Sequence, residues 1–555
     1  EISLGLVGSE MCIRDRYSYT LCAKAGDQAT QTAINVKNVK TVTYMDGLNR
    51  PVRELRINAD SKLTVHLLRP IYTALYNAQN QLIEETVVDW KGDIDRPMTT
   101  HFRYDDWGQQ FCTVGPDKVE VYEVTEPRGT ADWQDGVVTT SWRQFTDSAG
   151  EVIKATGKSV TLVNKFEKPV QEQRWNLAAA LVSTHFYEYD GLGRTAKETD
   201  ALSNVTLYTY DAYARVVQTV LPGGAVVVRS YAPHSTQDLP VSISVNTIEL
   251  GTQTFDGLGR MCSSVTGGRC QAYEYLPGQT QPSKVIKPGG QVVKYDYNPL
   301  LGEEPEKRTA NGEVATYTYD LKNARLNSCS EAGLSLTRKY FSTGDIQSET
   351  QGVHSMVYNY SLHGLILAYT DVLGNTQSYH YDFERGGRIV STKLGLTESI
   401  FSYDELGQTT TITTTDTTDS ASPLSVSINL QYDEYGRETE RVFDLNGVKQ
   451  KLVQRYNAVD NLVQRELTAI DIEGNVLEVL RDEAYEYDAR ARLTKYTCLG
   501  SQKPVDPYGN LIDEQIFRFD NLDNITRVKT TFGTESNTAA SVSYTHLTLP
   551  TSDLV

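Results

Sequence analysis

The chain has 555 residues, and its 53 Lys and Arg against 71 Asp and Glu give a net charge of −18. A chain this acidic cannot neutralise a phosphate backbone as a whole, so the composition argues against a dedicated nucleic-acid-binding protein. Its 39% of hydrophobic residues is too high for wholesale disorder. The 34 Tyr, against 13 Phe, and the 40 Gly are typical of strands and tight turns.

Signals for membrane insertion, export and metal binding are not found in the sequence. The longest apolar runs, such as Leu177–Val182, fall far short of the roughly 18 residues that a membrane helix needs, and no signal peptide is visible. The 7 Cys contain no C-x-x-C pair. We interpret them as small buried hydrophobic residues, with disulfides or a metal site as the alternative. The 8 His lack a ligand-like spacing. We expect no metal, no cofactor and no membrane span.

The two ends of the chain differ from the rest. Residues 5–16, GLVGSEMCIRDR, and residues 542–552, VSYTHLTLPTS, resemble translated sequencing adapters. Such segments have to be set aside before the fold is considered. We therefore predict that residues 1–16 and 542–555 are adapter-like artefacts that make few contacts, and that the natural protein continues past both. The alternative is a pair of natural flexible termini.

Between the ends, the pattern Tyr-x-Tyr-Asp-x-x-Gly-Arg recurs, with a full copy at Tyr187–Arg194. The Asp position recurs at 190, 211, 232 (Ala232) and 256, so the spacing is 21, 21 and 24 residues. A period of this size indicates stacked supersecondary units. We assign a structural turn role to these members of the motif: Tyr189, Asp190, Gly193, Arg194, Tyr210, Asp211, Arg215, Asp256, Gly259, Arg260, Tyr432, Asp433, Gly436 and Arg437.

Each repeat is predicted to contain two turns. In the first turn, the Asp can accept its own backbone amides and the Gly three residues later can take a positive φ, which together indicate a type I turn with a G1 bulge. The Arg that follows can pair with this Asp or stack on a neighbouring Tyr. A second turn, such as Asp200–Asn204 or Asp371–Asn375, lies about ten residues further on. The segments between turns have strand length, so we predict antiparallel hairpins throughout.

Side chains are predicted to alternate along each strand, so that one face of every strand lies on the same side of the sheet. Leu424, Val426, Ile428, Leu430 and Tyr432 alternate along one strand. The two Tyr of each motif are also two residues apart, so they share a face on which aromatic rings of adjacent strands can stack. The Thr-rich run of residues 409–419 is expected to be an exposed hairpin extension between repeats, with an O-linked stalk as the alternative.

The first third of the chain is less regular than the remainder. All 5 Trp lie between Trp90 and Trp175, and the repeat spacing is irregular there. We predict an irregular β region with degenerate repeats over residues 17–165 and the regular repeats over residues 166–541. Rows of Trp can stack on sugar rings, but packing within and between strands is the favoured interpretation.

These motifs, repeated in register, resemble those of the Rhs, or YD-repeat, family, and the resemblance runs through most of residues 17–533. The family includes bacterial polymorphic toxins, the paired B and C components of insecticidal toxin complexes, and the teneurins of animals. The resemblance implies an all-β repeat protein in which an antiparallel hairpin ribbon spirals into a curved shell, partly open here, with Tyr on its concave wall. In bacterial members the shell encloses a C-terminal toxic effector until delivery.

The sequence contains none of the common catalytic signatures: it has no G-x-S-x-G, no P-loop and no H-E-x-x-H. Asp506–Gly509 has letters of a signature that, in the family, belongs to a core domain with self-cleaving aspartates. A repeat strand follows it here, so we interpret it as a turn. Each turn Asp is a copy of many others, whereas an active site needs one place that differs. We therefore predict no catalytic, cofactor or metal residues.

The function expected from this resemblance is a non-enzymatic shell fragment of an Rhs-type toxin. Its partners would be its own C-terminal effector or other toxin-complex subunits, and it would be secreted or delivered from the bacterial cytoplasm by a specialised secretion system. The alternative is a binding module for carbohydrate or a cell surface, with glycans as partners of exposed aromatic rows.

Overall fold

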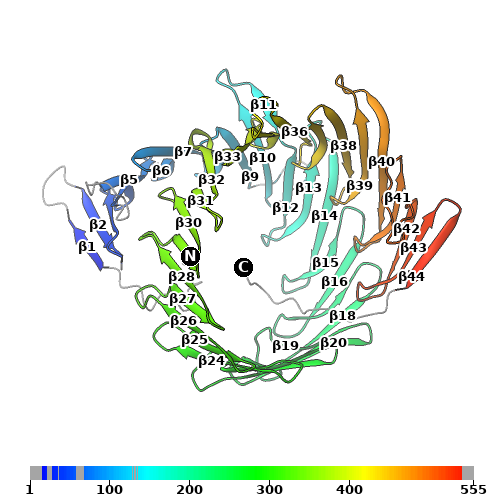
Figure 1. Ribbon diagram of the computed structural model, residues 1–555, viewed down its shortest axis with the longest axis horizontal. Helices are drawn as coiled ribbons and strands as arrows, with labels where there is room; N and C mark the ends of the chain where they lie inside the picture. The colour runs from blue at the N-terminus through cyan, green and yellow to red at the C-terminus, as the bar shows by residue number, and fades with distance from the viewer. Residues whose placement is uncertain are drawn as a thin grey trace. The chain divides into compact units, whose positions relative to one another are not determined.

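The computed structural model describes residues 16–21, 28–35, 37–57, 68–127, 129, 133 and 135–540. These residues form 44 β-strands and one short 3₁₀ turn, η2 (Phe383–Arg385), with no α-helix among them (Figure 1). The prediction of an all-β repeat protein is therefore confirmed. Within the described part of the chain, no helix is both long and apolar enough to cross a membrane.

The strands follow one another at short intervals along the whole described chain. Those before residue 200 are β1 (Arg16–Thr20), β2 (Ala29–Ile34), β3 (Lys40–Met45), β4 (Pro51–Ile57), β5 (Leu68–Tyr76), β6 (Leu82–Lys91), β7 (Ile94–Tyr104), β8 (Gln110–Val114), β9 (Val119–Glu126), β10 (Val138–Thr146), β11 (Val152–Ala155), β12 (Lys158–Val163), β13 (Pro169–Trp175), β14 (Leu181–Tyr189) and β15 (Thr195–Thr199).

The middle of the chain has shorter and more regular strands. They are β16 (Val205–Tyr210), β17 (Val216–Val220), β18 (Val226–Tyr231), β19 (Pro240–Val245), β20 (Ile248–Phe255), β21 (Met261–Thr266), β22 (Arg269–Glu274), β23 (Lys284–Ile286), β24 (Val292–Asn298), β25 (Glu304–Ala310), β26 (Glu313–Tyr319), β27 (Leu326–Glu331), β28 (Leu334–Tyr340), β29 (Ile346–Gln351), β30 (His354–Tyr360), β31 (Ile366–Thr370), β32 (Thr376–Asp382), β33 (Arg388–Leu394) and β34 (Thr397–Tyr403).

The last strands include the longest of the described chain. They are β35 (Thr409–Asp416), β36 (Leu424–Tyr432), β37 (Glu438–Leu445), β38 (Val448–Tyr456), β39 (Leu462–Ile470), β40 (Val476–Tyr487), β41 (Leu493–Leu499), β42 (Glu514–Phe519), β43 (Ile525–Phe532) and β44 (Glu535–Ala540).

Strands that are neighbours in sequence pair antiparallel, as the hairpin repeat predicts. In the run from β13 to β20, each strand pairs with the next, and successive hairpins are drawn as a continuous ribbon (Figure 1). The register shifts where a strand enters a first turn, for example between Glu188 and Tyr189 and between Thr209 and Tyr210. This shift is the β-bulge that was predicted for the first turn.

The chain forms two compact units, and each combines stretches that are far apart in sequence. Unit 1 consists of Glu1–Val121, Tyr273–Ser402 and Thr414–Pro423. Unit 2 consists of Tyr122–Ala272, Tyr403–Thr413 and Leu424–Val555. The predicted boundary near residue 165 is a separate division of the chain and stays a prediction.

Two other predictions concern particular segments. Most of the adapter-like ends, residues 1–15 and 542–555, lies outside the described residues, whereas Arg16 begins β1. The expectation of an exposed extension at residues 409–419 was wrong for most of the run, because Thr409–Asp416 is the half-buried strand β35. Thr is β-branched and fits a pleated strand well, which explains this outcome.

The described residues form only a small buried core. Most strand residues are half-buried, and fully buried side chains are few and dispersed. One apolar cluster in unit 2 joins Ala225, Val227, Val245 and Leu522. Each repeat therefore buries little by itself, and contacts between repeats have to supply stability.

Candidate functional site

The first turn is organised by its Asp. In the full copy, the Gly193 N–H donates to the Asp190 carbonyl (3.0 Å) and the Asp190 N–H donates to the Arg194 carbonyl (2.9 Å). The Asp190 Oδ1 accepts from the backbone N–H groups of Leu192 (2.9 Å) and Arg194 (3.0 Å). Gly193 has a φ of 74°, which a residue without Cβ adopts without strain. The predicted turn chemistry is confirmed.

The Arg of the first turn connects one repeat to the next. Arg194 pairs with its own Asp190 through Nε (2.8 Å) and Nη2 (2.6 Å). Its guanidinium carbon lies 4.5 Å from the ring centroid of Tyr210, and Nη1 donates to the carbonyl of Asp211 (3.1 Å). Both Tyr210 and Asp211 belong to the following repeat. The sequence predicted an ion pair or ring stacking, and Arg194 makes both; we call this set of contacts the Arg clamp.

The hydroxyl of the second Tyr of the motif donates a hydrogen bond to a backbone carbonyl earlier in the chain. The hydroxyl of Tyr210 donates to the carbonyl of Thr195 (2.8 Å), the first residue of β15. Tyr189 donates to the carbonyl of Pro169 (2.6 Å), the first residue of β13. Adjacent repeats are therefore joined by a cation–π contact and by hydrogen bonds in both directions.

The other predicted motif members occupy equivalent places. Arg215 pairs with Asp211 (2.7 Å), Arg260 with Asp256 (2.7 Å) and Arg437 with Asp433 (2.7 Å). Gly259 and Gly436 have φ values of 77° and 83°. The rings that follow and the backward bonds repeat as well: Arg215 lies over Tyr231 (4.5 Å), Arg437 lies over Tyr456 (5.0 Å), and Tyr432 donates to the carbonyl of Thr409 (2.9 Å).

Degenerate repeats keep the same backbone with other residues. Where Phe341 stands in the Asp position, its N–H still donates to the Asp345 carbonyl (2.9 Å) and Gly344 still donates back (2.9 Å). In the second turn at Asp200, the Nδ2 of Asn204 donates to the Asp200 Oδ2 (2.8 Å) and so replaces the guanidinium. The turn is thus a property of the backbone pattern, and the Arg clamp is added in the full motif.

The turn carboxylates of Asp190, Asp211 and Asp256 are held in their ionised form. Hydrogen bonds from the Arg194 side chain and backbone lower the pKa of Asp190, and the Arg260 side chain does the same for Asp256. Burial alone would raise the pKa of Asp211, but the hydrogen bonds from Arg215 outweigh burial and lower it. A carboxylate with a lowered pKa is poorly suited to act as a general acid near neutral pH. The turn Asp residues are therefore turn-forming groups.

Late first turns of unit 2 also contact strands that lie far back in the sequence. The Nζ of Lys154 pairs with Asp404 (2.5 Å), and Arg143 donates to the carbonyl of Leu406 (2.9 Å). The Gly157 N–H donates to the carbonyl of Glu434 (2.9 Å). We call this joint, in which first turns lie on strand ends roughly 250 to 286 residues earlier, the seam of unit 2.

Unit 1 has a comparable seam. The His363 N–H donates to the Oδ1 of the fully buried Asp89 (2.9 Å), and the Leu362 N–H donates to the carbonyl of Trp90 (3.0 Å). Lys37 pairs with Asp320 in the same unit. Neither seam was predicted from the sequence, because the first turns involved have the same motif as other first turns and their partners lie hundreds of positions away.

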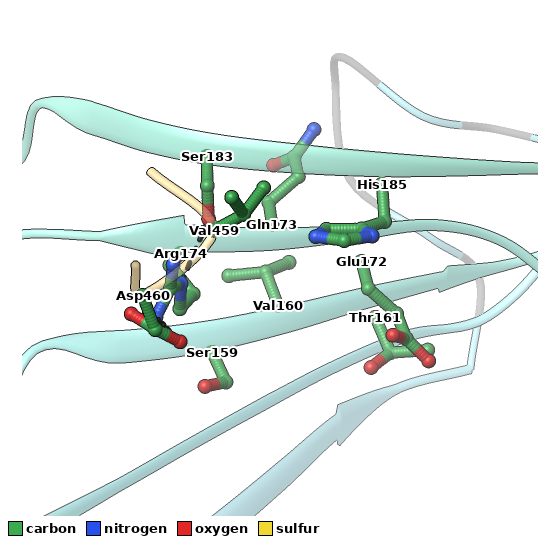
Figure 2. Close-up of a pocket in the computed structure, with 10 residues that line it drawn as sticks. All are labelled: Ser159, Val160, Thr161, Glu172, Gln173, Arg174, Ser183, His185, Val459 and Asp460. Atoms are coloured by element: carbon green, nitrogen blue, oxygen red, sulfur yellow. Dashed lines mark hydrogen bonds and ion pairs between the residues drawn. The ribbon is translucent and has the colours of Figure 1, made fainter. Parts of the chain in front are cut away.

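One polar pocket lies in the seam of unit 2. It has a volume of about 380 Å³ and is lined by β12, β13, β14 and the turn that contains Asp460. Figure 2 shows Arg174, Ser183 and Asp460 at one end and His185 with Glu172 at the other. Arg174 donates to both carboxylate oxygens of Asp460 (2.8 and 3.0 Å) and to the Ser183 hydroxyl (2.8 Å).

The charged residues of this pocket form ion pairs and hydrogen bonds. Burial would raise the pKa of Asp460, but its ion pairs with Arg174 and Arg437 outweigh burial and lower it. At the other end, the Tyr187 hydroxyl donates to Glu172 (2.9 Å), and burial followed by this contact raises the pKa of Tyr187 to about 12. The ion pair between Arg174 and Asp460 thus holds the turn that contains Asp460 against β13.

A second set of residues with shifted pKa values surrounds Glu483. This buried carboxylate pairs with Arg465 (2.6 Å) and accepts from the Tyr496 hydroxyl (2.7 Å). Burial would raise the pKa of Glu483, and these two partners outweigh burial and lower it. The group is an ion pair between strands. Among the described residues, no three His, Cys, Asp or Glu side chains are placed to hold a metal ion.

Two segments with alternative interpretations are also located. Asp506–Gly509 is a turn, as predicted: the Gly509 N–H donates to the Asp506 carbonyl (3.0 Å), and Asn510 binds both carboxylate oxygens. Four of the five Trp donate their indole N–H groups within their own unit, to the carbonyls of Pro70 and Val163 and to the side chains of Gln144 and Gln173. These contacts favour packing over sugar stacking.

Comparisons with known proteins agree with this geometry. The RHS Repeat family profile matches residues 189–226, which contain two first turns and two second turns. No curated protein matches the chain significantly. A crystal structure of TcdB2-TccC3-TEV is 11% identical with a TM-score of 0.50, and the match covers 94% of this chain and 32% of that one. A Photorhabdus luminescens Tc holotoxin pore is 12% identical with a TM-score of 0.49, covering 93% and 31%. At these identities the likeness concerns the fold, and the chain spans about a third of the matched chains.

Proposed function

We propose that this chain is a segment of an Rhs/YD-repeat toxin shell, that it is non-enzymatic and that its role is enclosure; the RHS Repeat profile match at residues 189–226 and the likeness in fold support this. The observation that carries the proposal is the uniformity of the Arg clamp. Arg194, Arg215 and Arg437 each lie over the Tyr ring of the following repeat and donate a hydrogen bond to a backbone carbonyl of its turn. A wall of any length can be made by adding one such unit to the next, whereas a recognition site requires a place that differs.

The proposed content of the shell is a C-terminal effector of the same natural protein. The solved structures that resemble this chain contain TcdB2 together with TccC3, so other toxin-complex subunits are the second class of partner. The protein would act outside the producing cell, after secretion or delivery by a specialised secretion system. Because the chain spans about a third of the matched chains, closing the shell would require further polypeptide.

We further propose that the chain has no enzymatic activity of its own. In support, the pKa values of the turn carboxylates of Asp190 and Asp471 are lowered by hydrogen bonds from Arg194 and Asn475. The Asp506 turn follows the same hydrogen-bond pattern; in addition, Asp506 is buried and accepts a bond from Asn537 (3.1 Å). Replacing Asp506 with Asn is therefore expected to leave the chain intact during prolonged incubation, as in the unmodified protein. Cleavage next to residue 506 that is lost in the Asn variant would contradict the proposal.

Enclosure is tested in the full-length natural protein. Deleting the segment that corresponds to residues 166–540 should make the effector susceptible to protease and toxic to its producer. The intact protein, and a control with Leu373→Ser at an exposed turn, should keep the effector protected. An effector that is equally stable and equally harmless without the repeats would refute the proposal and would favour a surface-binding role.

A further inference from the structure

The third residue of the first turn, which we call the turn-apex residue, differs sharply in burial along unit 2. In late repeats (residues 404–524), Leu406 is 3% exposed and Leu522 is 6% exposed. In early repeats (residues 164–260), Leu192 is 77% exposed and Leu258 is 76% exposed. Other turn-apex residues show the same difference: Phe166 and Tyr213 of early repeats are exposed, whereas Tyr435 and Val459 of late repeats are half-buried.

Early strand ends cover the late turn-apex residues. Leu522 packs with Ala225, Val227 and Val245. These three residues lie in or beside two second turns, Leu221–Ala225 and the two-residue turn that begins at Asn246. The seam is thus a joint in which an edge of first turns lies on an edge of second turns.

An antiparallel ribbon places successive turns at opposite ends of its strands. The first turns of the early repeats therefore line one edge, and the second turns line the other edge, which the late first turns cover. The outer edges of this arrangement are the early first turns and the late second turns. The late second-turn edge is also rich in exposed apolar residues: Leu445, Val448, Ile472, Val476 and Leu477.

The late second-turn edge resembles the surface that Leu522 occupies. The covered surface combines a five-residue turn at 221 and a two-residue turn at 246, whose starts are 246 − 221 = 25 residues apart. The late edge combines a two-residue turn at 446 and a five-residue turn at 471, whose starts are 471 − 446 = 25 residues apart. In both surfaces, Val residues flank the turns: Val226 and Val245 in the first, Val448 and Val476 in the second.

We propose that the early first-turn edge of one molecule docks on the late second-turn edge of a second copy of this chain. The occupant is a second copy because one chain carries both exposed halves of a joint that unit 2 already forms internally. Leu192 and Leu258 take the place of Leu406 and Leu522, and the surface around Val448 and Ile472 receives them. The contact is heterologous, so it continues head to tail from copy to copy.

The chemistry of this joint sets its response to salt. Each copy has a net charge of −18, so two copies repel one another at low ionic strength. Screening by salt reduces that repulsion, while the apolar contact is retained. Association is therefore expected to increase between low and moderate salt, and this dependence does not rely on any enclosed effector.

Sedimentation velocity of the full chain over a wide concentration range tests the proposal. The unmodified protein should form dimers and longer species as concentration rises. An early-edge variant (Leu192→Ser with Leu258→Ser) and a late-edge variant (Val448→Ser with Ile472→Ser) should each remain monomeric alone. Mixing the two variants should give a dimer that does not grow further, because each variant retains one of the two halves.

Controls separate loss of the joint from loss of folding. Leu373→Ser changes a Leu with 81% exposure at the same position of a second turn in unit 1, and it should associate like the unmodified protein. Far-UV circular dichroism should be unchanged in all variants. A monomeric unmodified protein at all concentrations, association that persists in both variants, or folded variants that fail to dimerise when mixed would each overturn the proposal.

Discussion

Early and late first turns of unit 2 have the same backbone hydrogen bonds, yet they have different surroundings. The turn at Asp190 and the turn at Asp404 both close with the Gly N–H on the Asp carbonyl (3.0 and 3.1 Å) and with Oδ1 on the same two amides. Leu192, in the turn at Asp190, projects into solvent, whereas Leu406, in the turn at Asp404, is buried. The local motif therefore determines the turn, and the path of the ribbon determines what the turn contacts.

This difference separates two sources of stability. The Arg clamp joins each repeat to its neighbour in sequence, as in other repeat proteins whose stability is a sum of nearest-neighbour terms. The seam adds contacts between residues roughly 250 to 286 positions apart, such as Arg174 with Asp460. We expect contacts of such separation to form late in folding, because a long loop has to be closed before they contribute.

The largest effect is expected when a turn-apex Leu is truncated. Leu522→Ala should destabilise unit 2 by about 2–4 kcal/mol, because it leaves a cavity in the cluster with Ala225, Val227 and Val245. Leu258→Ala, at the same turn position, should cost no more than about 0.5 kcal/mol because the side chain is exposed. Urea unfolding measures both. Equal losses in the two variants would show that burial does not distinguish early from late turns.

The sequence was informative about everything that is local. The Asp, Gly and Arg of the first turn predicted its hydrogen bonds, the positive φ of Gly193 and Gly259, and the pairing of Arg194. The burial of Leu522 was not predictable, because its partners around Ala225 lie about 300 residues earlier and no repeat period relates them. Nor does the sequence distinguish Leu192 from Leu406, since both follow an Asp by two positions.

A second comparison concerns the Gly of the turn. Gly193→Val should destabilise by about 1–2 kcal/mol, because Val is forced into a positive φ of 74°. Gly436→Val should cost more, because a Cβ there would lie 3.3 Å from the Gln408 side chain in addition to the same strain. Gly191→Ala is the matched control: nothing lies within 4 Å of its Cβ position, and its φ is not positive. Thermal unfolding of the three variants provides the ranking, and a destabilised Gly191 variant would remove the backbone explanation.

A smaller and more uniform effect is expected for the Tyr hydroxyls. Tyr210→Phe removes the bond to the Thr195 carbonyl, and Tyr432→Phe removes the bond to the Thr409 carbonyl. Each should cost about 0.5–1.5 kcal/mol, as for other single hydrogen bonds. The early and late variants should match, because this bond joins sequence neighbours and not the seam. A clearly larger loss for Tyr432 in urea unfolding would mean that the seam and the repeat contacts are coupled.

The last comparison uses pH. The pKa of Asp190 is lowered by Arg194, and that of Asp460 is lowered by Arg174 and Arg437 against the opposing effect of burial. A group whose pKa is lower in the folded than in the unfolded state stabilises the fold above its unfolded pKa of about 3.9, and this stabilisation is lost as the pH falls through the folded value. Stability should therefore change little from about pH 7 to pH 5 and fall below about pH 4.

The Asn variants then distinguish the two carboxylates. Asp190→Asn should reduce the acid-dependent loss slightly and leave hydrogen exchange in β13 unchanged, because its contacts stay within the early repeats. Asp460→Asn removes the negative charge that pairs with Arg174 across the seam, so it should also increase exchange of the β13 amides at neutral pH. Both effects should be small and should weaken with added salt, because these side chains are partly exposed and well screened. Equal exchange in β13 for both variants would mean that Asp460 does not hold the late turn against the early strands.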